Sequence, residues 1–299
     1  MTIAAQRVAG GRTSRRLNLQ LTRLKSLSLL SSGNGVVLFT FPEFDPIALD
    51  LGFVQVRWYG LMYVAGFLVG WFGMRARANR AGSSLTQEQV DDLVFYIMLG
   101  VILGGRIGYM LLYDFGNFVG DPISIFFIWE GGMSFHGGLI GVLVAFWLFA
   151  RRIGLPFFDV ADRVAPWVPP GLGFGRIGNF INGELWGKTT SPDAPWSVMV
   201  DGVARHASQL YEAALEGLVL FLILWAYSLK PRPRMAVSGL FLLFYGAFRF
   251  LIEFVRVPDN GRYVAFDWVT RGQIYSVPMV IVGLVLFFLA HRHGKEARA

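Results

Sequence analysis

Seven long apolar segments constrain the fold of this chain more than any other feature. Each is long enough to cross the hydrocarbon core of a bilayer, which takes about 20 residues in a helix. They cover residues 57–75, 92–113, 126–149, 157–178, 209–229, 236–256 and 273–291. A spanning segment must satisfy its backbone polar groups internally, and helices do this within one segment. The sequence therefore predicts an all-α membrane protein of about seven transmembrane helices.

The composition agrees with a membrane protein and excludes several other classes. The chain is 54% hydrophobic and only 16% charged, whereas soluble domains are about 25% charged. It contains no Cys, which excludes disulfides, thiolate metal sites and a cysteine nucleophile. Only four His residues are present, two of them near the C-terminus, so we expect no zinc site and no other cofactor. The net charge of +7 is typical of basic cytoplasmic loops, and we expect no nucleic-acid partner.

The loop charges predict an orientation. Lys and Arg clusters follow the first, third, fifth and seventh segments, whereas Asp residues predominate in the opposite loops. Basic loops face the cytoplasm in membrane proteins. We therefore expect the core to begin in the periplasm and end in the cytoplasm. The longest outer loop, at about residues 179–208, is rich in Gly, Asn, Pro and Trp and suggests a small periplasmic cap between the fourth and fifth helices.

Residues 1–40 differ from the rest of the chain. Six basic residues between Arg7 and Lys25 precede the first acidic residue, Glu43. The stretch Lys25–Leu30 is too short to span a bilayer, and no clear small-residue cleavage site marks a signal peptide. This basic stretch also conflicts with a periplasmic start. We interpret residues 1–40 as a disordered extension, or as the result of a start codon assigned too far upstream. Residues 41–299 form the predicted membrane domain.

The sixth segment carries polar residues where apolar ones would be expected. Tyr245, Arg249, Glu253 and Arg256 recur at i, i+4, i+8 and i+11, which places them on one face of a helix. Charges at membrane depth cost roughly a few kcal/mol each and usually mark function. One alternative is an Arg249–Glu253 ion pair that only locks helix packing. Otherwise two arginines on one wet face indicate an anion ligand, because guanidinium groups match phosphate in a bidentate manner.

A glycine-rich stretch ends the fourth segment. Residues 173–187 read Gly-Phe-Gly-Arg-Ile-Gly-Asn-Phe-Ile-Asn-Gly-Glu-Leu-Trp-Gly. They place Arg176, Asn179, Asn182 and Glu184 together, beside glycines that allow tight turns or close approach of a ligand. A glycine-rich packing seam is the alternative, but it does not explain an Arg and a Glu at membrane depth.

For the other candidate site residues, a purely structural role explains the sequence as well as a functional role does. His136, in Ser-Phe-His-Gly-Gly, lies near the outer start of the third segment. Imidazole is the natural general base at neutral pH, although a lone His more often forms structural hydrogen bonds. His206 lies in the stretch 205–212, which enters the fifth segment from outside. Tyr59 and Arg106 fit a structural position as well as a functional one.

Together these stretches resemble the prolipoprotein diacylglyceryl transferase family. The resemblance covers about residues 41–292 and includes GRIGNFINGELWG, SFHGGLIG, RHxSQLYE and YxxxRFxxEFxR in the family's order and spacing. It implies a bacterial inner-membrane enzyme with seven spanning helices. It further implies transfer of the diacylglyceryl group of phosphatidylglycerol to the lipobox cysteine of a prolipoprotein signal peptide, with release of glycerol-1-phosphate.

The resemblance also implies which residues form the site. Arg176 and Arg249 carry over as the key arginines. We add Asn182 because it lies in the same motif. The further residues that carry over are His136, Tyr59, Asn179, Glu184, Gly187, His206, Tyr245 and Glu253.

These residues suggest a mechanism in which arginines stabilise the leaving group. Arg176 and Arg249 would bind the glycerophosphate anion. The acceptor thiol, with an ordinary pKa of about 8.5, attacks as its thiolate. Either His136 or a carboxylate such as Glu253 would take the proton, and the sequence leaves this choice open.

A transporter of a small anion is the main alternative. It would use the same intramembrane arginines and a broken fourth helix, since transporters bind substrates near the midplane through interrupted helices. The lack of a convincing inverted repeat and the sizeable outer loop argue against it. An assembly subunit without chemistry would leave the intramembrane charges unexplained.

Overall fold

The structure is a computed structural model of the 299-residue chain. It describes residues 39–42, 44–52, 55–79, 85–128, 131–258 and 261–296. The chain forms two compact units. The hairpin unit comprises Met1–Pro42 and Lys188–His206, and the helical unit comprises Glu43–Gly187 and Ala207–Ala299. The prediction for residues 1–40 falls almost entirely outside the described residues.

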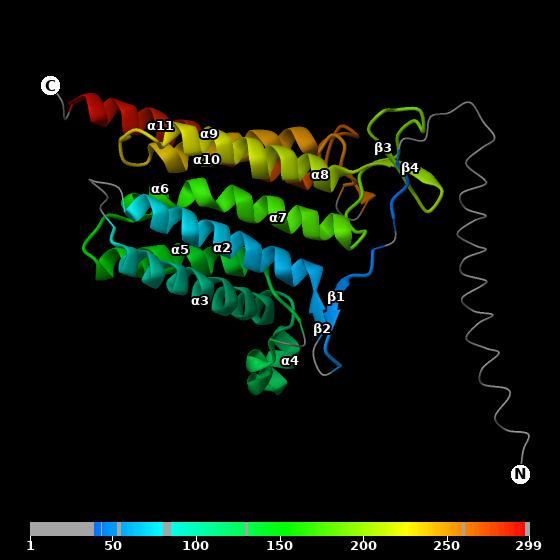
Figure 1. Ribbon diagram of the computed structural model, residues 1–299, viewed down its shortest axis with the longest axis horizontal. Coiled ribbons are helices and arrows are strands. Elements are labelled where there is room, and N and C mark those ends of the chain that lie inside the picture. Colours follow the sequence, from blue (N-terminus) through cyan, green and yellow to red (C-terminus); the bar gives the residue numbers. More distant parts are fainter. Residues whose placement is uncertain are drawn as a thin grey trace, which may run out of the picture. The chain divides into compact units, whose positions relative to one another are not determined.

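The helical unit begins with the two short strands β1 and β2 and continues with long helices (Figure 1). Strands β1 (Ile47–Asp50) and β2 (Gln55–Arg57) pair antiparallel. The first half continues with α2 (Trp58–Ala78), α3 (Gln87–Leu112), α4 (Phe115–Gly120), the 3-10 helix η2 (Pro122–Phe126), α5 (Phe135–Arg152), α6 (Phe157–Val164) and η4 (Ala165–Trp167). The second half contains α7 (Val168–Ile181), α8 (Ser208–Glu212), the π-helix η5 (Ala213–Val219), α9 (Leu220–Tyr227), α10 (Ala236–Ile252) and α11 (Arg271–Glu296).

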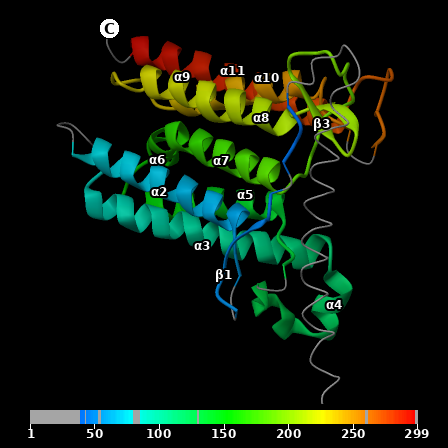
Figure 2. The same cartoon turned by 45° about the vertical axis from the view of Figure 1, so that its right-hand side comes forward.

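The long helices lie side by side in pairs (Figures 1 and 2). Helix α3 packs along α5, α2 along α7, and α10 along α11. Helix α7 also packs against η5, which belongs to the continuous helix Ser208–Tyr227. Through this contact α7 connects the α2 side of the unit to the α10 side.

Local sequence signals explain where several helices begin and break. The Thr86 hydroxyl accepts a hydrogen bond of 3.2 Å from the Gln89 backbone, and the Gln89 side chain accepts one of 3.0 Å from the Thr86 backbone. This capping box starts α3, and Ser134 caps α5 by accepting from the Gly137 backbone. The fourth predicted segment is interrupted by η4, which separates α6 from α7. Pro169 lies in the first turn of α7, where a missing N–H costs little.

Four helices are long and apolar enough to cross a membrane, and α10 is a shorter apolar helix. The four are Gln87–Leu112, Phe135–Arg152, Ser208–Tyr227 and Arg271–Arg292. These helices support the all-α membrane class, while the number of seven spans stays a prediction. The predicted start of the third segment at residue 126 is wrong. Gly131 and Gly132 have positive φ angles of 88° and 77°, so α5 begins only at Phe135.

Glycines allow α3 and α5 to approach closely. A Cβ atom added at Gly100 would lie 2.6 Å from the Gly141 carbonyl oxygen, and one added at Gly108 would lie 2.6 Å from the Gly137 Cα. A side chain at these positions would therefore clash with the neighbouring backbone. Small residues at helix contacts are typical of membrane proteins, where direct backbone packing drives association.

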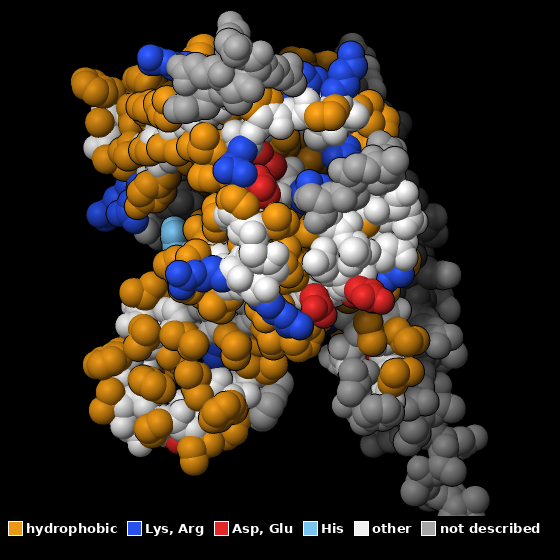
Figure 3. Space-filling view, turned by 90° about the vertical axis from the view of Figure 1, so that its left-hand side faces the viewer, with side chains coloured by type: hydrophobic (Ala, Val, Ile, Leu, Met, Phe, Trp, Pro, Cys, Tyr) orange, Lys and Arg blue, Asp and Glu red, His pale blue; other side chains and the backbone are white. Residues whose placement is uncertain are grey.

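Basic side chains gather at one end of the helical unit, where Figure 3 shows several groups of Lys and Arg among apolar side chains. Some form ion pairs, such as Arg234 with Asp159 at 2.7 Å and Arg152 with Asp92 at 3.4 Å. This end corresponds to the loops that the sequence assigns to the cytoplasm. The basic residues come from the last turns of α2 and α5 and from the loop after α9: Arg75, Arg77, Arg151, Arg152, Lys230, Arg232 and Arg234.

The described part of the hairpin unit contains β3 (Ser197–Val200) and β4 (Val203–His206), paired antiparallel. The two turn residues, Asp201 and Gly202, have φ angles of 50° and 76°, which is typical of a tight hairpin turn. Thr40 forms a parallel bridge with Met199 beside this hairpin. The loop predicted at about 179–208 corresponds to the chain between α7, which ends at Ile181, and α8, which begins at Ser208, and its role as a periplasmic cap stays a prediction.

We expect Gly100→Ala to destabilise the helical unit by about 1–3 kcal/mol, because the new methyl group would overpack the α3–α5 contact. Gly171→Ala is the matched control, since a Cβ atom there meets nothing within 4 Å. Thermal unfolding of the purified variants in detergent tests this expectation. Equal melting temperatures for the two variants would contradict it.

Candidate active site

One buried carboxylate, that of Glu212, holds three arginines together. Its Oε2 lies 2.6 Å from Arg176 Nε and 3.7 Å from Arg249 Nη1. Its Oε1 lies 2.6 Å from Arg256 Nη1. The Glu212 side chain is only 1% exposed. These four residues come from α7, α8, α10 and the turn after α10. Together with Glu253, they are called the arginine cluster below.

Glu253 is the second carboxylate of the arginine cluster. Its Oε1 lies 2.7 Å from Arg249 Nη2 and 3.2 Å from Arg256 Nε, and its Oε2 accepts a hydrogen bond of 2.6 Å from the Thr270 hydroxyl. The structural Arg249–Glu253 ion pair therefore exists. It does not occupy the whole guanidinium, because Nη1 of Arg249 has no hydrogen-bond partner among the described residues. The arginine cluster thus contains three arginines and two carboxylates, and Glu216 lies one turn after Glu212 on the same helix.

The predicted asparagines connect Arg176 to the loop that leaves α7. Asn179 accepts a hydrogen bond of 3.4 Å from Arg176 Nη1 and donates one of 2.7 Å to Glu184 Oε1. Asn182 donates to the same Glu184 oxygen at 3.4 Å. The Glu184 carbonyl in turn accepts from the side-chain amide of Gln209 in α8. These bonds hold the start of α8, and with it Glu212, beside the end of α7.

Three further predicted residues lie in the same region. A Cβ atom added at Gly178 would lie 2.9 Å from the Tyr59 ring, so α2 and α7 meet closely there. Gly187 forms an antiparallel bridge with Arg256. Tyr245 lies on α10 one turn before the first arginine of that helix.

The two predicted histidines lie on other elements, His136 on α5 and His206 in the hairpin unit. His136 is exposed in the first turn of α5 and, among the described residues, has no hydrogen bond or ion pair with the arginine cluster. His206 lies in β4 of the hairpin unit, where its backbone donates to the Lys188 carbonyl at 3.0 Å. Burial lowers the pKa of His206, and the nearby Lys188 charge lowers it further, so this imidazole is neutral at pH 7.

Glu212 is the central residue that sequence reasoning missed. It ends the Ser-Gln-Leu-Tyr-Glu stretch at the start of an apolar helix, and Glu216 follows one turn later. This i, i+4 pair of acidic residues is the same kind of signal that singled out Arg249 and Glu253. Charged residues at membrane depth pair with one another, so the arginines required an acidic partner.

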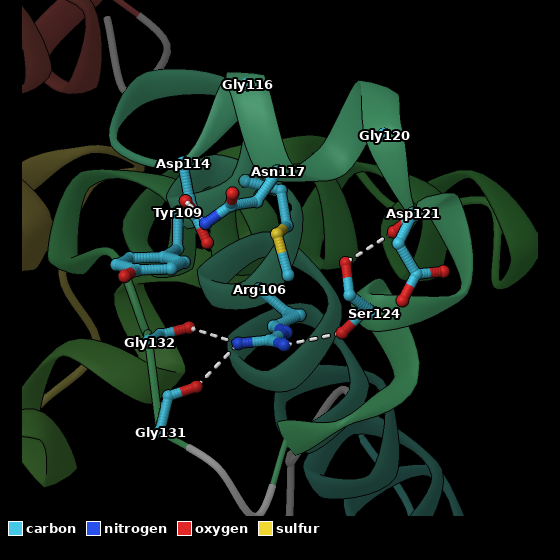
Figure 4. A pocket seen from close by; sticks show the side chains of 11 residues that line it. Arg106, Tyr109, Asp114, Gly116, Asn117, Gly120, Asp121, Ser124, Gly131 and Gly132 are labelled. Atoms are coloured by element: carbon cyan, nitrogen blue, oxygen red, sulfur yellow. Dashed lines mark hydrogen bonds between the residues drawn. The ribbon is translucent and has the colours of Figure 1, made fainter.

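A separate cavity of about 460 Å³ lies at the elbow formed by α4 and η2, beside Arg106 (Figure 4). None of the residues that line it belongs to the arginine cluster. Arg106 is buried and holds the chain before α5 in place, which supports a structural position for this residue. It donates to the main-chain carbonyls of Ser124 at 2.5 Å, Ile125 at 3.1 Å, Gly131 at 2.5 Å and Gly132 at 3.2 Å.

Comparison with known proteins gives the family. The family model for prolipoprotein diacylglyceryl transferase matches residues 46–289. The chain belongs to this family. The phosphatidylglycerol–prolipoprotein diacylglyceryl transferase of Nitratidesulfovibrio vulgaris strain Hildenborough is 59% identical over 264 residues, which cover 87% of this chain and 100% of the relative. The enzyme of the same name from Oleidesulfovibrio alaskensis is 57% identical and covers 87% of this chain and 98% of its own length.

A more distant relative agrees. The protein of the same name from Xanthomonas axonopodis pv. citri is 55% identical over 273 residues, which cover 83% of this chain and 92% of the relative. The resemblance that the motifs indicated is therefore confirmed.

Within the described residues, no group of three His, Asp or Glu side chains is placed to hold a metal ion.

We expect Glu212→Ala to lower the free energy of unfolding by about 3–5 kcal/mol, because removing one partner leaves buried charges uncompensated. Asp92→Asn is the control. It removes an exposed pair with Arg152, whose side chains are 58% and 51% exposed, and such pairs contribute about 0–1 kcal/mol. Denaturant unfolding in detergent measures both changes. A loss at Glu212 no larger than that at Asp92 would show that the arginines do not depend on this carboxylate.

Proposed function

We propose that this chain transfers the diacylglyceryl group of phosphatidylglycerol to the lipobox cysteine of a prolipoprotein and releases glycerol-1-phosphate. Its family and the names of its relatives support this reaction. One structural observation carries the proposal. Arg249 is largely buried beside Arg176, on the same Glu212 oxygen, and its Nη1 atom has no hydrogen-bond partner among the described residues. This is the environment in which a phosphate monoanion is bound strongly.

The two arginines would act on the leaving group. Both guanidinium groups bind the phosphate of the lipid and stabilise the charge on glycerol-1-phosphate as it leaves. Glu212 and Glu253 fix their side chains in advance, so that little reorganisation is needed when the lipid binds. The acceptor sulfur attacks C3 of the diacylglyceryl unit as a thiolate, and the bond from C3 to the phosphate oxygen breaks.

The predicted site residues divide into three groups under this proposal. Arg176 and Arg249 contact the phosphate, with Tyr59 and Tyr245 beside them. The motif residues Asn179, Asn182, Glu184 and Gly187 shape the loop that leaves α7. His136 stays a predicted catalytic residue and His206 a predicted substrate-binding residue, and both come from segments that the sequence assigns to the outer side.

The proposed site lies in a bacterial inner membrane, near its periplasmic leaflet. Arg176 is in the last two turns of α7, Glu212 is at the start of the helix Ser208–Tyr227, and Glu253 follows the end of α10. These positions lie toward the end of the helical unit opposite the basic loops (Figure 1). A lipobox cysteine beyond its signal sequence and the headgroup of an outer-leaflet phospholipid both reach that level.

A transporter of a small anion is the second candidate, because it would also need intramembrane arginines. Incubating the purified protein with phosphatidylglycerol and a lipobox peptide distinguishes the two. A peptide that gains the mass of a diacylglyceryl group supports the transferase. Uptake of glycerol phosphate into proteoliposomes without any modified peptide would support the transporter.

We expect Arg249→Ala to lower transfer by about 100-fold or more, the usual cost of losing a group that stabilises a developing anion. The protein should still insert in the membrane. Arg249→Lys should retain part of the activity, since it keeps the charge but not the bidentate geometry. Arg152→Ala, which removes an exposed arginine, is the control. Near-normal peptide modification by Arg249→Ala would refute the phosphate-binding assignment.

The orientation can be tested by cysteine labelling, because the chain contains no Cys. We expect Asp193→Cys to react with a membrane-impermeant maleimide from the periplasmic side and Lys230→Cys only from the cytoplasmic side. Both variants should stay active, which provides the control for correct folding. The reverse pattern would place the proposed chemistry on the wrong side of the membrane.

A further inference from the structure

We propose that Glu216 is the base that accepts the proton of the acceptor thiol. This inference rests on the transferase function proposed above and adds a residue that the family motifs did not single out. The step is the deprotonation of the acceptor thiol, for which the sequence left His136 and Glu253 as alternatives.

The buried carboxylates of this region differ in their hydrogen-bond donors. Glu212 contacts three arginines, and Glu253 contacts two arginines and the Thr270 hydroxyl. Protonating either would weaken several ion pairs. Glu216 is also buried, with 1% of its surface exposed, yet neither of its carboxylate oxygens has a hydrogen-bond partner among the described residues. It can therefore take up a proton without losing a donor.

Glu216 lies next to the arginine cluster without bonding to it. It is one turn after Glu212 on η5, a π-helical segment, and π-helical turns occur frequently at functional sites. A Cβ atom added at Gly217 would lie 2.7 Å from the Gly173 Cα, so η5 packs directly on α7 close to Arg176. The ionisable groups that act on Glu216 electrostatically are Glu212, Arg176, Arg249, Arg256 and Tyr245.

An ionisable residue in an apolar helix is costly and is usually retained for function. Within the part of the chain that the structure describes, Glu216 makes no ion pair that would explain its presence as a packing device. Its position one turn from the residue that orients both phosphate-binding arginines brings a proton acceptor next to the leaving group. His136, in contrast, is exposed, and no hydrogen bond or ion pair among the described residues joins it to the arginine cluster.

The S–H proton of the acceptor passes to a Glu216 oxygen, directly or through one water, which gives a thiolate and a neutral carboxylic acid. The sulfur electron pair forms the bond to C3, and the electron pair of the C3–O bond leaves with the phosphate oxygen. Glu216 then returns its proton to the phosphate of the released glycerol-1-phosphate.

The test compares Glu216→Gln with Glu88→Gln, the same chemical change at an exposed position of α3. Each variant is assayed with phosphatidylglycerol and two lipobox peptides, one with cysteine and one with selenocysteine. A selenol ionises at lower pH than a thiol and does not need a base at neutral pH. We expect Glu216→Gln to lower kcat for the cysteine peptide about 100- to 10,000-fold, with KM for the lipid little changed, and to use the selenocysteine peptide nearly as well as the wild type does.

Raising the pH gives a second readout. The residual rate of Glu216→Gln with the cysteine peptide should increase as the pH approaches about 8.5, where the free thiol ionises without help. Glu88→Gln should match the wild type with both peptides at every pH. If Glu216→Gln does not fold, Glu216→Asp retains the acid at a shorter reach and should show a smaller loss, again confined to the cysteine peptide.

Three outcomes would overturn the inference. A wild-type rate of Glu216→Gln with the cysteine peptide would mean that no proton passes to this residue. Equal losses with the cysteine and selenocysteine peptides would mean that Glu216 only maintains the structure. If the wild-type protein modified neither peptide, the transferase function itself would fail, and this inference with it.

Discussion

The ion pairs of Glu212 are the interaction on which the helical unit depends. Three arginines in an apolar bundle would each carry a large desolvation cost if left unpaired. A single carboxylate that is 1% exposed contacts all three. Because these residues come from separate helices, the pairs draw the ends of α7, α8 and α10 together. The close glycine contact between α7 and η5 makes that approach sterically feasible.

The same pairs prepare the site for its substrate. Bonds to Glu212 and Glu253 orient Arg176 and Arg249 before any lipid arrives, and preorganised donors stabilise a developing charge most effectively. The ion pairs do not occupy every donor, because Nη1 of Arg249 has no hydrogen-bond partner among the residues that the structure describes. Structural ion pairing and anion binding are thus two consequences of one arrangement rather than alternatives.

Much of this arrangement follows from the sequence, because apolar runs predict helices and intramembrane arginines stand out against them. The break before α7 follows from its prolines. Other features depend on tertiary packing. Which arginines pair with Glu212 depends on helices far apart in the chain, and α5 starts late because Gly131 and Gly132 adopt positive φ angles. The spacing of Tyr245 to Arg256 predicted one helical face, yet α10 ends at Ile252 and the last two charged residues meet in the following turn.

A direct distance measurement tests whether the arginine cluster binds the lipid phosphate. Solid-state NMR dephasing between ³¹P of phosphatidylglycerol and ¹⁵N of labelled arginine side chains reports this contact in a bilayer. We expect strong dephasing for the wild-type protein, and a marked loss for Arg249→Lys, because hydrogen-bonded guanidinium and phosphate groups lie in direct contact. Equal dephasing in both proteins, or none in the wild type, would contradict phosphate binding by Arg249.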